Sequence, residues 1–219
     1  MACLTAGAAR AQVAPSDAEI RAYGPLHTAA LRGDLPMLAA TIAGHAPLDA
    51  RDGHGRTALH VATFASQRDA IKLLAAAGAD LGALENDRYD AVTIAAVADD
   101  EETLALLLSL GASAKLTTSR YDGTALIAAA HLGHDGVVRQ LIAAGAPLDH
   151  VHNLPWTATI EAVVLGDGGP RHQACLRALV DAGADLTITD RDGRTPLQLA
   201  RSRNLRDRVR ILEAAPPKR

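Results

Sequence analysis

The chain has 219 residues, of which 48% are apolar, and its formal net charge is -3 at pH 7. This length suits one large domain or two small ones, and the apolar fraction is high enough for a buried core. Because the net charge is close to zero, the chain offers no broad cationic surface, and we expect no nucleic-acid partner. The longest apolar stretches, such as residues 91–98, are far shorter than the roughly 20 residues of a membrane helix, so we expect no membrane insertion. The two cysteines, Cys3 and Cys175, are too few for a disulfide framework or a zinc site.

Residues 1–15 resemble the end of a secretory signal. Ala9 and Ala11 give the pattern of small residues that signal peptidase requires, here before Gln12. The basic start and the apolar stretch that normally precede such a site are absent. Two expectations stay open: the signal remnant of a periplasmic or secreted protein, or the disordered tail of a cytoplasmic one.

A short sequence pattern then recurs along most of the chain. Its copies start at residues 24, 57, 90, 124, 157 and 195, which are 33, 33, 34, 33 and 38 residues apart. A second marker follows each of the first four copies by about 21 residues, and follows the fifth copy five residues late. The first marker reads Gly24-Pro-Leu-His27, Thr57-Ala-Leu-His60, Asp90-Ala-Val-Thr93, Thr124-Ala-Leu-Ile127, Thr157-Ala-Thr-Ile160 and Thr195-Pro-Leu-Gln198. A fixed period of this length is the signature of stacked structural repeats.

With this period, its two markers and the turns Asp52-Gly-His-Gly-Arg-Thr57 and Asp190-Arg-Asp-Gly-Arg-Thr195, the chain resembles an ankyrin-repeat protein. The resemblance covers six units that start near residues 22, 52, 85, 119, 152 and 190. It implies an all-α solenoid of stacked helix-turn-helix units with short β-turn or hairpin tips. We expect one domain over residues 16–214, followed by a disordered tail at 215–219. In the third unit Asp90 replaces the threonine and Arg88 replaces the turn glycine, so its turn departs from the pattern.

The physics of one unit agrees with this architecture. In the second unit, Thr57 is placed to cap a first helix, and Gly78 is placed to end a second helix that starts near Asp69. Two short helices cannot bury their apolar sides alone, so stacking of the units must create the core. Ser16 and Glu19 have capping-box spacing and predict a short extra helix that covers the open end of the stack. At the other end, a polar cap is expected from Arg201, Arg203, Arg206, Arg208 and Arg210.

The repeat phase predicts where the five aromatic residues lie. Tyr23, Tyr89 and Trp156 each precede the threonine position directly, Tyr121 lies three residues before it, and Phe64 lies seven after it. In ankyrin-like stacks these positions line the concave groove, where the resemblance implies that partners bind. Exposed aromatic rings are frequent binding anchors, although rings at turn tips can also stiffen neighbouring turns. The predicted partner-binding residues are Tyr23, His54, Arg56, Phe64, Asp87, Tyr89, Arg120, Tyr121, His131, Leu132, Asn153, Leu154 and Trp156.

The fifth unit is irregular, because residues 165–172 insert a glycine-rich loop between its two helices. Glu161 stands where the other units have apolar or small residues. A carboxylate at this position must be mostly buried and needs hydrogen-bond donors, which we expect from the backbone of the inserted loop. This structural role is favoured over a catalytic or ligand-binding site built from Glu161, Asp167 and His172. Four histidines of neighbouring units, among them His131 and His152, do not suffice to predict a metal site.

These observations lead to one function hypothesis and two alternatives. The leading one is a non-enzymatic module, without cofactor or metal, that binds a protein or peptide partner in its concave groove and is itself a monomer. The first alternative is an inhibitor or immunity-type protein that uses the same groove. The second is a ligand-binding or hydrolase-like site around Glu161 and residues 166–172.

Overall fold

The structure is a computed structural model that describes residues 14–166 and 168–215. The predicted signal remnant up to residue 13, the tail from residue 216 and Asp167 therefore lie outside the described residues.

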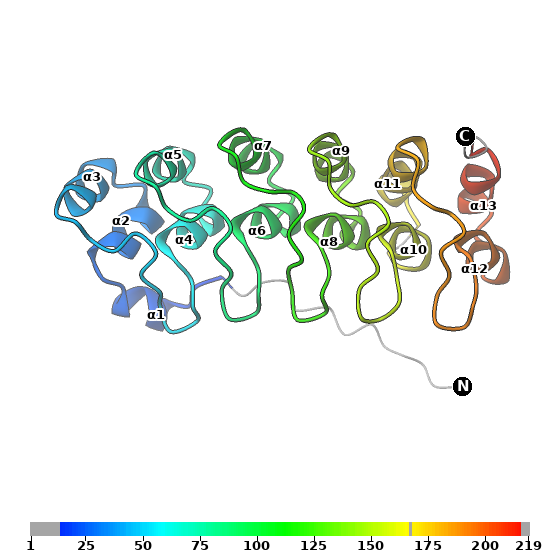
Figure 1. Ribbon diagram of the computed structural model, residues 1–219, viewed down its shortest axis with the longest axis horizontal. Helices are drawn as coiled ribbons and strands as arrows, with labels where there is room; N and C mark the ends of the chain where they lie inside the picture. The colour runs from blue at the N-terminus through cyan, green and yellow to red at the C-terminus, as the bar shows by residue number, and fades with distance from the viewer. Residues whose placement is uncertain (1–13, 167, 216–219) are drawn as a thin grey trace.

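The described residues form thirteen helices and contain no strand, which confirms the predicted all-α solenoid. The helices are α1 (Asp17–Ala22), α2 (Pro25–Arg32), α3 (Leu35–Ala43), α4 (Ala58–Phe64), α5 (Arg68–Ala76), α6 (Ala91–Val97), α7 (Glu101–Ser109), α8 (Ala125–Leu132), α9 (Asp135–Ala143), α10 (Ala158–Val164), α11 (Pro170–Asp181), α12 (Pro196–Ser202) and α13 (Arg206–Glu213). Figure 1 shows six helix pairs side by side, with the second helices in one row, the first helices in another, and the turns projecting to one side.

Side-chain caps explain where the first helix begins in the second to sixth units, whereas α2 of the first unit begins after Gly24 without one. Thr57 accepts a hydrogen bond from the backbone N–H three residues later, and Thr124, Thr157 and Thr195 repeat this contact. Asp90 makes the same contact in the third unit, so the departure from threonine preserves the cap. The predicted capping box of Ser16 is also present and starts α1.

Within the described residues, the turn tips are closed by a few backbone hydrogen bonds instead of by paired strands. The N–H of Glu85 donates to the carbonyl of Tyr89 at 3.0 Å, for example. Thr118 and Gly123 form an isolated bridge in the fourth unit. Arg88 adopts φ of +67°, close to the +75° of Gly55 at the matching position. The third turn therefore keeps the left-handed geometry of the pattern with a residue that adopts it at a cost.

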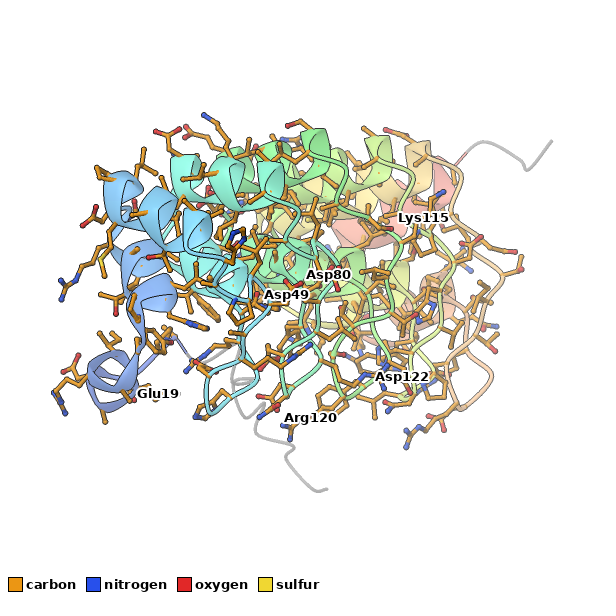
Figure 2. The ribbon with its side chains drawn as sticks, turned by 60° about the vertical axis from the view of Figure 1, so that its left-hand side comes forward. Glu19, Asp49, Asp80, Lys115, Arg120 and Asp122 are labelled. Atoms are coloured by element: carbon orange, nitrogen blue, oxygen red, sulfur yellow. The ribbon has the colours of Figure 1, made fainter. Side chains whose placement is uncertain are left out.

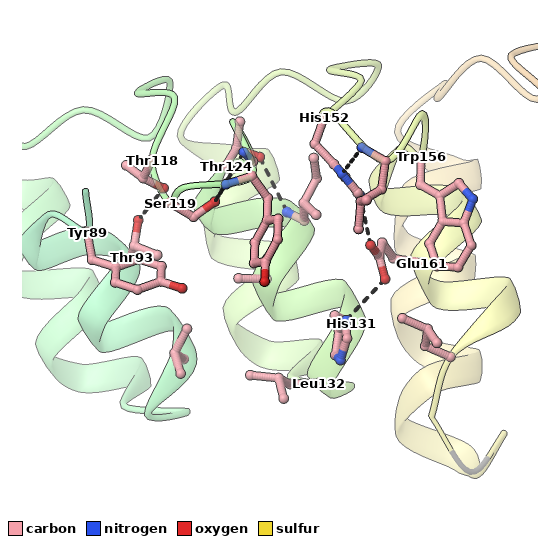
Figure 3. A pocket seen from close by; sticks show the side chains of 17 residues that line it. Tyr89, Thr93, Thr118, Ser119, Thr124, His131, Leu132, His152, Trp156 and Glu161 are labelled. Atoms are coloured by element: carbon pink, nitrogen blue, oxygen red, sulfur yellow. Dashed lines mark hydrogen bonds and ion pairs between the residues drawn. The ribbon is translucent and has the colours of Figure 1, made fainter. Parts of the chain in front are cut away.

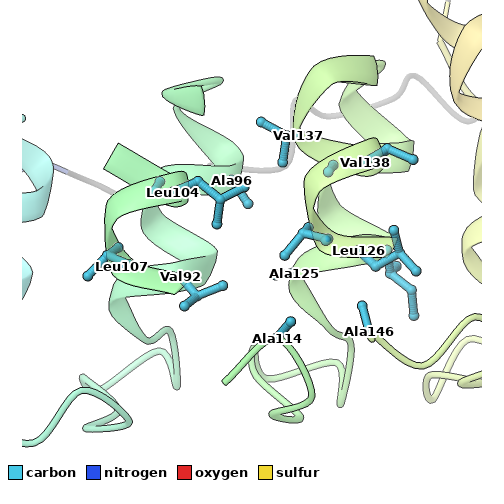
Figure 4. Close-up of a cluster of buried hydrophobic side chains, with 14 of the residues drawn as sticks. Val92, Ala96, Leu104, Leu107, Ala114, Ala125, Leu126, Val137, Val138 and Ala146 are labelled. Atoms are coloured by element: carbon cyan, nitrogen blue, oxygen red, sulfur yellow. The ribbon is translucent and has the colours of Figure 1, made fainter. Parts of the chain in front are cut away.

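The core runs along the stack between the two rows of helices. Figure 4 shows a part of it, where Val92 and Leu104 of the third unit face Ala125 and Val137 of the fourth. The buried leucines and valines share this core with many buried alanines, whose small side chains let the short helices approach closely without large rings.

Polar side chains also join consecutive units. His27 donates from Nε2 to the carbonyl of Arg56 at 3.0 Å, and His60 donates to the carbonyl of Tyr89 at 3.1 Å. Arg208 donates to the carbonyl of Val163 at 2.6 Å, at the end of α10. Arg208 is buried, so the prediction that it solvates the end of the stack is wrong; it instead pairs a helix carbonyl that has no partner within its own helix.

Arg171 links three units at once. Its guanidinium contacts Asp99 of the third unit at 2.8 and 3.0 Å and Asp135 of the fourth unit at 2.9 Å. The bond to Asp99 joins residues that are 72 positions apart.

Candidate functional site

A pocket of about 310 Å³ opens between the turns and the first helices of the third, fourth and fifth units. Its lining is mainly apolar and aromatic (Figure 3). The pocket is lined by Tyr89, Thr93, Val97, Thr118, Ser119, Tyr121, Gly123, Thr124, Ile127, Ala128, His131, Leu132, His152, Leu154, Trp156, Glu161 and Leu165. Its size and composition are those of a binding pocket.

This pocket gathers part of the predicted partner-binding set. Tyr89, Tyr121, His131, Leu132, Leu154 and Trp156 line it, together with Glu161. Tyr121 is 49% exposed, Leu154 is 44% exposed and Leu132 is 36% exposed, so these side chains form an open rim. Trp156 packs partly against the core and presents the rest of its ring to the pocket (Figure 3).

A second group of predicted residues lies at the N-terminal end instead. Tyr23 donates to Asp52 at 3.0 Å, and its ring packs at a tilt against the ring of His27. His54 pairs with Glu19 at 2.8 Å. Arg56 contacts both Glu19 and Asp52 and is only 2% exposed. The prediction that Arg56 lies on an exposed binding surface is therefore wrong: the two carboxylates hold it inside the first turn.

The remaining predicted residues link neighbouring tips. Arg120 pairs with Asp87 of the preceding tip, and the N–H of Asn153 donates to the carbonyl of Tyr121 at 3.0 Å. Figure 2 shows Arg120 and Asp122 at the ends of the turns, away from the two rows of helices. Phe64, at the end of α4, is half-buried and lies outside the pocket lining.

The buried carboxylate at the floor of the pocket is held by two histidines. Glu161 is 4% exposed. His131 approaches its Oε2 at 3.1 Å from Nδ1, and His152 approaches its Oε1 at 2.9 Å from Nε2 (Figure 3). The expected burial of Glu161 is confirmed, but the expected backbone donors from the inserted loop are wrong, because these side chains of the fourth and fifth units take their place.

The hydrogen bonds fix the protonation of this group. Burial raises the pKa of the Glu161 carboxyl, but the hydrogen bonds from His131 and His152 outweigh burial and hold the pKa below its ordinary value. An ionised carboxylate only accepts hydrogen bonds, so each histidine donates to it. The N–H of Leu154 donates to Nδ1 of His152 at 3.1 Å, so His152 carries its single proton on Nε2 and is neutral.

The repeat register explains how His152 comes to face Glu161. At the position of His152, the other units carry an oxygen acceptor for the N–H groups of their own turn, as Asp52 and Asp190 do at 2.8 to 3.0 Å. His152 takes over this role through Nδ1 and has a second ring nitrogen left for the pocket. A histidine at the aspartate position, nine residues before a glutamate at an apolar position, is the signal from which this pair was predictable.

The inserted loop of the fifth unit packs against His172 instead of Glu161. His172 is buried and donates from Nε2 to the carbonyl of His131 at 3.1 Å, at the end of α8. Gly166 has φ of +72°, and a Cβ atom on it would come within 2.0 Å of the His172 ring. The loop thus closes over His172, which lies outside the pocket lining together with its neighbours 168–171. Glu161 and His172 do not share one site, and Asp167 lies outside the described residues.

Within residues 14–166 and 168–215, no group of three histidine, cysteine, aspartate or glutamate side chains is arranged to hold a metal ion. Over the same residues, no helix is both long and apolar enough to cross a membrane.

Comparisons with known proteins agree with the fold. The family model "Ankyrin repeats (3 copies)" matches residues 1–85 and 92–190. The ankyrin repeat protein YahD of Escherichia coli strain K12 is 31% identical over 188 residues, which cover 85% of this chain and 93% of YahD. A solved ankyrin repeat domain from Acinetobacter baumannii is 42% identical, with a TM-score of 0.82, over 87% of this chain and 97% of that one.

A more distant solved structure is the complex of a predatory endopeptidase of Bdellovibrio bacteriovorus with an immunity protein. The match has a TM-score of 0.72 at 22% identity and covers 87% of this chain and 97% of the other, so it is a likeness of fold alone. Ankyrin repeats form a fold of protein-protein interaction, and by its matched segments and its relatives this chain belongs to the ankyrin-repeat family.

Proposed function

We propose that this chain is a non-enzymatic binding module that holds a protein or peptide partner in its concave groove, with the pocket between units three and five as the anchor point. The observation that carries the proposal is the pocket itself, an apolar hollow lined by three of the five aromatic residues of the chain. Buried aromatic anchors surrounded by a polar rim dominate the affinity of protein interfaces.

The exposed apolar side chains at the rim of the pocket also support this proposal. Tyr121, Leu132 and Leu154 stay exposed around one opening, which leaves apolar surface in water unless a partner covers it. The polar tips around them are tied to one another, as Arg120 is to Asp87, so the groove is held in one shape before a partner arrives.

The test is a pull-down of partners from the native organism with the chain as bait. The double variant Trp156→Ala, Tyr121→Ala should lose a partner that the parent retains, while the free energy of unfolding falls by only about 1–2 kcal/mol, because Tyr121 is exposed and Trp156 packs only partly against the core. A control is Leu35→Ala, Met37→Ala, which removes two exposed apolar side chains of α3, outside the pocket lining. Equal retention by both double variants would overturn the proposal.

An inhibitor or immunity-type protein is the more specific form of the same proposal. It uses the same groove and differs in the identity of the partner, a toxin or enzyme. Co-purification with the product of a neighbouring gene, together with loss of that enzyme's activity on binding, tests it. We propose export to the periplasm as the setting, from Ala9 and Ala11, and fractionation of cells tests that location.

A further inference from the structure

The hydrogen bonds under the pocket decide which ring nitrogen of His131 faces a ligand. His131 donates from Nδ1 to the ionised Glu161, and its side chain is 37% exposed. In the neutral ring, the second nitrogen, Nε2, then carries a lone pair. Within the described residues this Nε2 has no hydrogen-bond donor, and His131 lines the pocket. The pocket thus presents an acceptor and calls for a donor on the ligand.

The charge of the pocket points to a cation. Glu161 carries a negative charge in a setting where few water molecules screen it, and its ion pairs within the described residues are with His131 and His152. His152 is neutral, and the seventeen residues of the lining include no lysine and no arginine. The charged side chains of the tips pair among themselves, as Arg88 does with Asp122 at 3.4 Å. A positive ligand group would therefore be attracted to the Glu161 carboxylate and would meet no lysine or arginine in the lining.

The walls suit a flat cation on an apolar stem. Tyr89, Tyr121 and Trp156 all line the pocket, and Figure 3 shows Tyr89 towards one end of it and Trp156 towards the other. Aromatic faces attract cations, and tryptophan does so most strongly. A guanidinium is planar, is less strongly hydrated than an ammonium and stacks on such rings, while its fork of N–H groups donates to acceptors beside them. The aliphatic part of an arginine side chain matches the apolar remainder of the lining.

We propose that this pocket receives an arginine side chain of the partner protein, with the guanidinium against the aromatic lining and one N–H donated to Nε2 of His131. This inference rests on the proposed function and specifies the anchor that the partner supplies. It assigns positioning roles to Glu161 and His152, which fix the tautomer of His131 and supply the charge.

The test uses a pair of small probes on the unaltered chain. Trp156 is the single tryptophan, so the indole N–H resonance in a nitrogen-15 NMR spectrum reports the pocket directly. N-acetyl-arginine methylamide should shift this resonance in a saturable titration. N-acetyl-citrulline methylamide has nearly the same shape without the charge and should bind at least about tenfold more weakly, which corresponds to about 1.4 kcal/mol. Equal binding of citrulline, or of the lysine analogue, would overturn the inference.

Two variants test whether the arginine probe binds in the pocket. Tyr121→Ala removes an exposed wall of the pocket and should weaken the arginine probe about three- to tenfold, whereas Leu35→Ala should leave its affinity unchanged. Glu161→Gln should remove the preference for arginine over citrulline. If the pull-down partner is lost with the pocket variants but arginine and citrulline bind alike, the groove function stands and the arginine anchor fails. If arginine binds selectively but no partner depends on the groove, the anchor stands and the proposed function fails.

Discussion

His152 donates from Nε2 to Oε1 of Glu161 over 2.9 Å, and both side chains are buried. Each residue departs from what the other units carry at its position, and each departure alone would be unfavourable. Glu161 without donors would be a buried bare charge, and His152 without an acceptor would leave a buried N–H unpaired. In the pair, the N–H of His152 stabilises the buried charge of Glu161, and the carboxylate accepts that N–H.

The two departures should therefore be coupled in stability. Glu161→Ala should cost about 1–3 kcal/mol of unfolding free energy, because it leaves the N–H of His152 without a partner. His152→Asp should also be unfavourable, because it sets a second carboxylate beside Glu161. The double variant gives the fifth unit the aspartate of Asp52 and the alanine of Ala128, and it should recover most of the loss. Urea denaturation of all four proteins measures the coupling, and additivity within about 0.5 kcal/mol would contradict the arrangement.

We expect Asp100, which caps α7, to contribute more to the free energy of unfolding than an ordinary helix cap. Burial raises the pKa of this carboxyl, but hydrogen bonds from Ser66, Thr103 and Arg68 outweigh it and lower the pKa from 3.8 to about 2. An acid whose pKa is lowered by folding stabilises the chain above its unfolded pKa, and this contribution is lost as pH falls towards the folded value. Asp100→Asn should cost about 2 kcal/mol at pH 7.

Thermal unfolding from pH 7 down to pH 2 checks this expectation. The difference between the parent and Asp100→Asn should shrink below about pH 4 and approach zero near pH 2. Asp34→Asn is the matched control, since Asp34 caps α3 through the N–H of Met37 and is exposed. A cost at Asp34 equal to that at Asp100 would show that the bridging contacts to Ser66 and Arg68 add nothing.

His60 should make the chain sensitive to mild acid. Burial lowers the pKa of its imidazole from 6.5 to about 4, in spite of the hydrogen bond to the carbonyl of Tyr89. Between these two pH values the unfolded chain binds a proton that the folded chain refuses, so stability falls as pH falls from 6.5 to 4, by about 3 kcal/mol. His60→Gln should be less stable at pH 7 but should lose less on acidification. His45→Gln, which alters an exposed histidine, should lose as much stability between pH 6.5 and pH 4 as the parent does. Denaturant titrations of each protein at both pH values measure this loss.

Arg88→Gly should stabilise the chain. The left-handed conformation of Arg88 costs about 1 kcal/mol, and its exposed pair with Asp122 returns only a fraction of that. After the extra freedom of glycine in the unfolded chain is subtracted, we expect a net gain of about 0.5 kcal/mol. The reverse change at the matching position, Gly55→Ala, should be destabilising, because its Cβ would lie 2.4 Å from the Asn86 side chain. Melting curves that show Arg88→Gly less stable than the parent would contradict this account.

The fold was predictable because it depends on local rules that repeat. Thr57 and Thr124 cap helices wherever the pattern places them, and the capping box of Ser16 announces α1. The period alone carries Tyr89, Tyr121 and Trp156 to one side of the stack, and the pocket gathers those three rings.

The same register fails where a side chain finds a charged partner outside the pattern. The register predicts the position of Arg56 along the unit but not its burial, which depends on Glu19 in α1 and on Asp52. The donor His131 of Glu161 was missed for the same reason, since it lies 30 residues away in another unit. Contacts of this kind depend on how one unit is rotated against the next, and no single unit contains that information.

The reach of Arg171 bears on how the stack comes apart. In a solenoid held only by adjacent contacts, the terminal helix pairs fray one after another. The guanidinium of Arg171 contacts both Asp135 of α9 and Asp99 of the third unit, so its full set of contacts forms only while the third, fourth and fifth units are all folded. Each such exposed ion pair stabilises the chain by less than about 1 kcal/mol. It nevertheless favours unfolding of these three units as one cooperative block, so the pocket stays formed until the whole block unfolds.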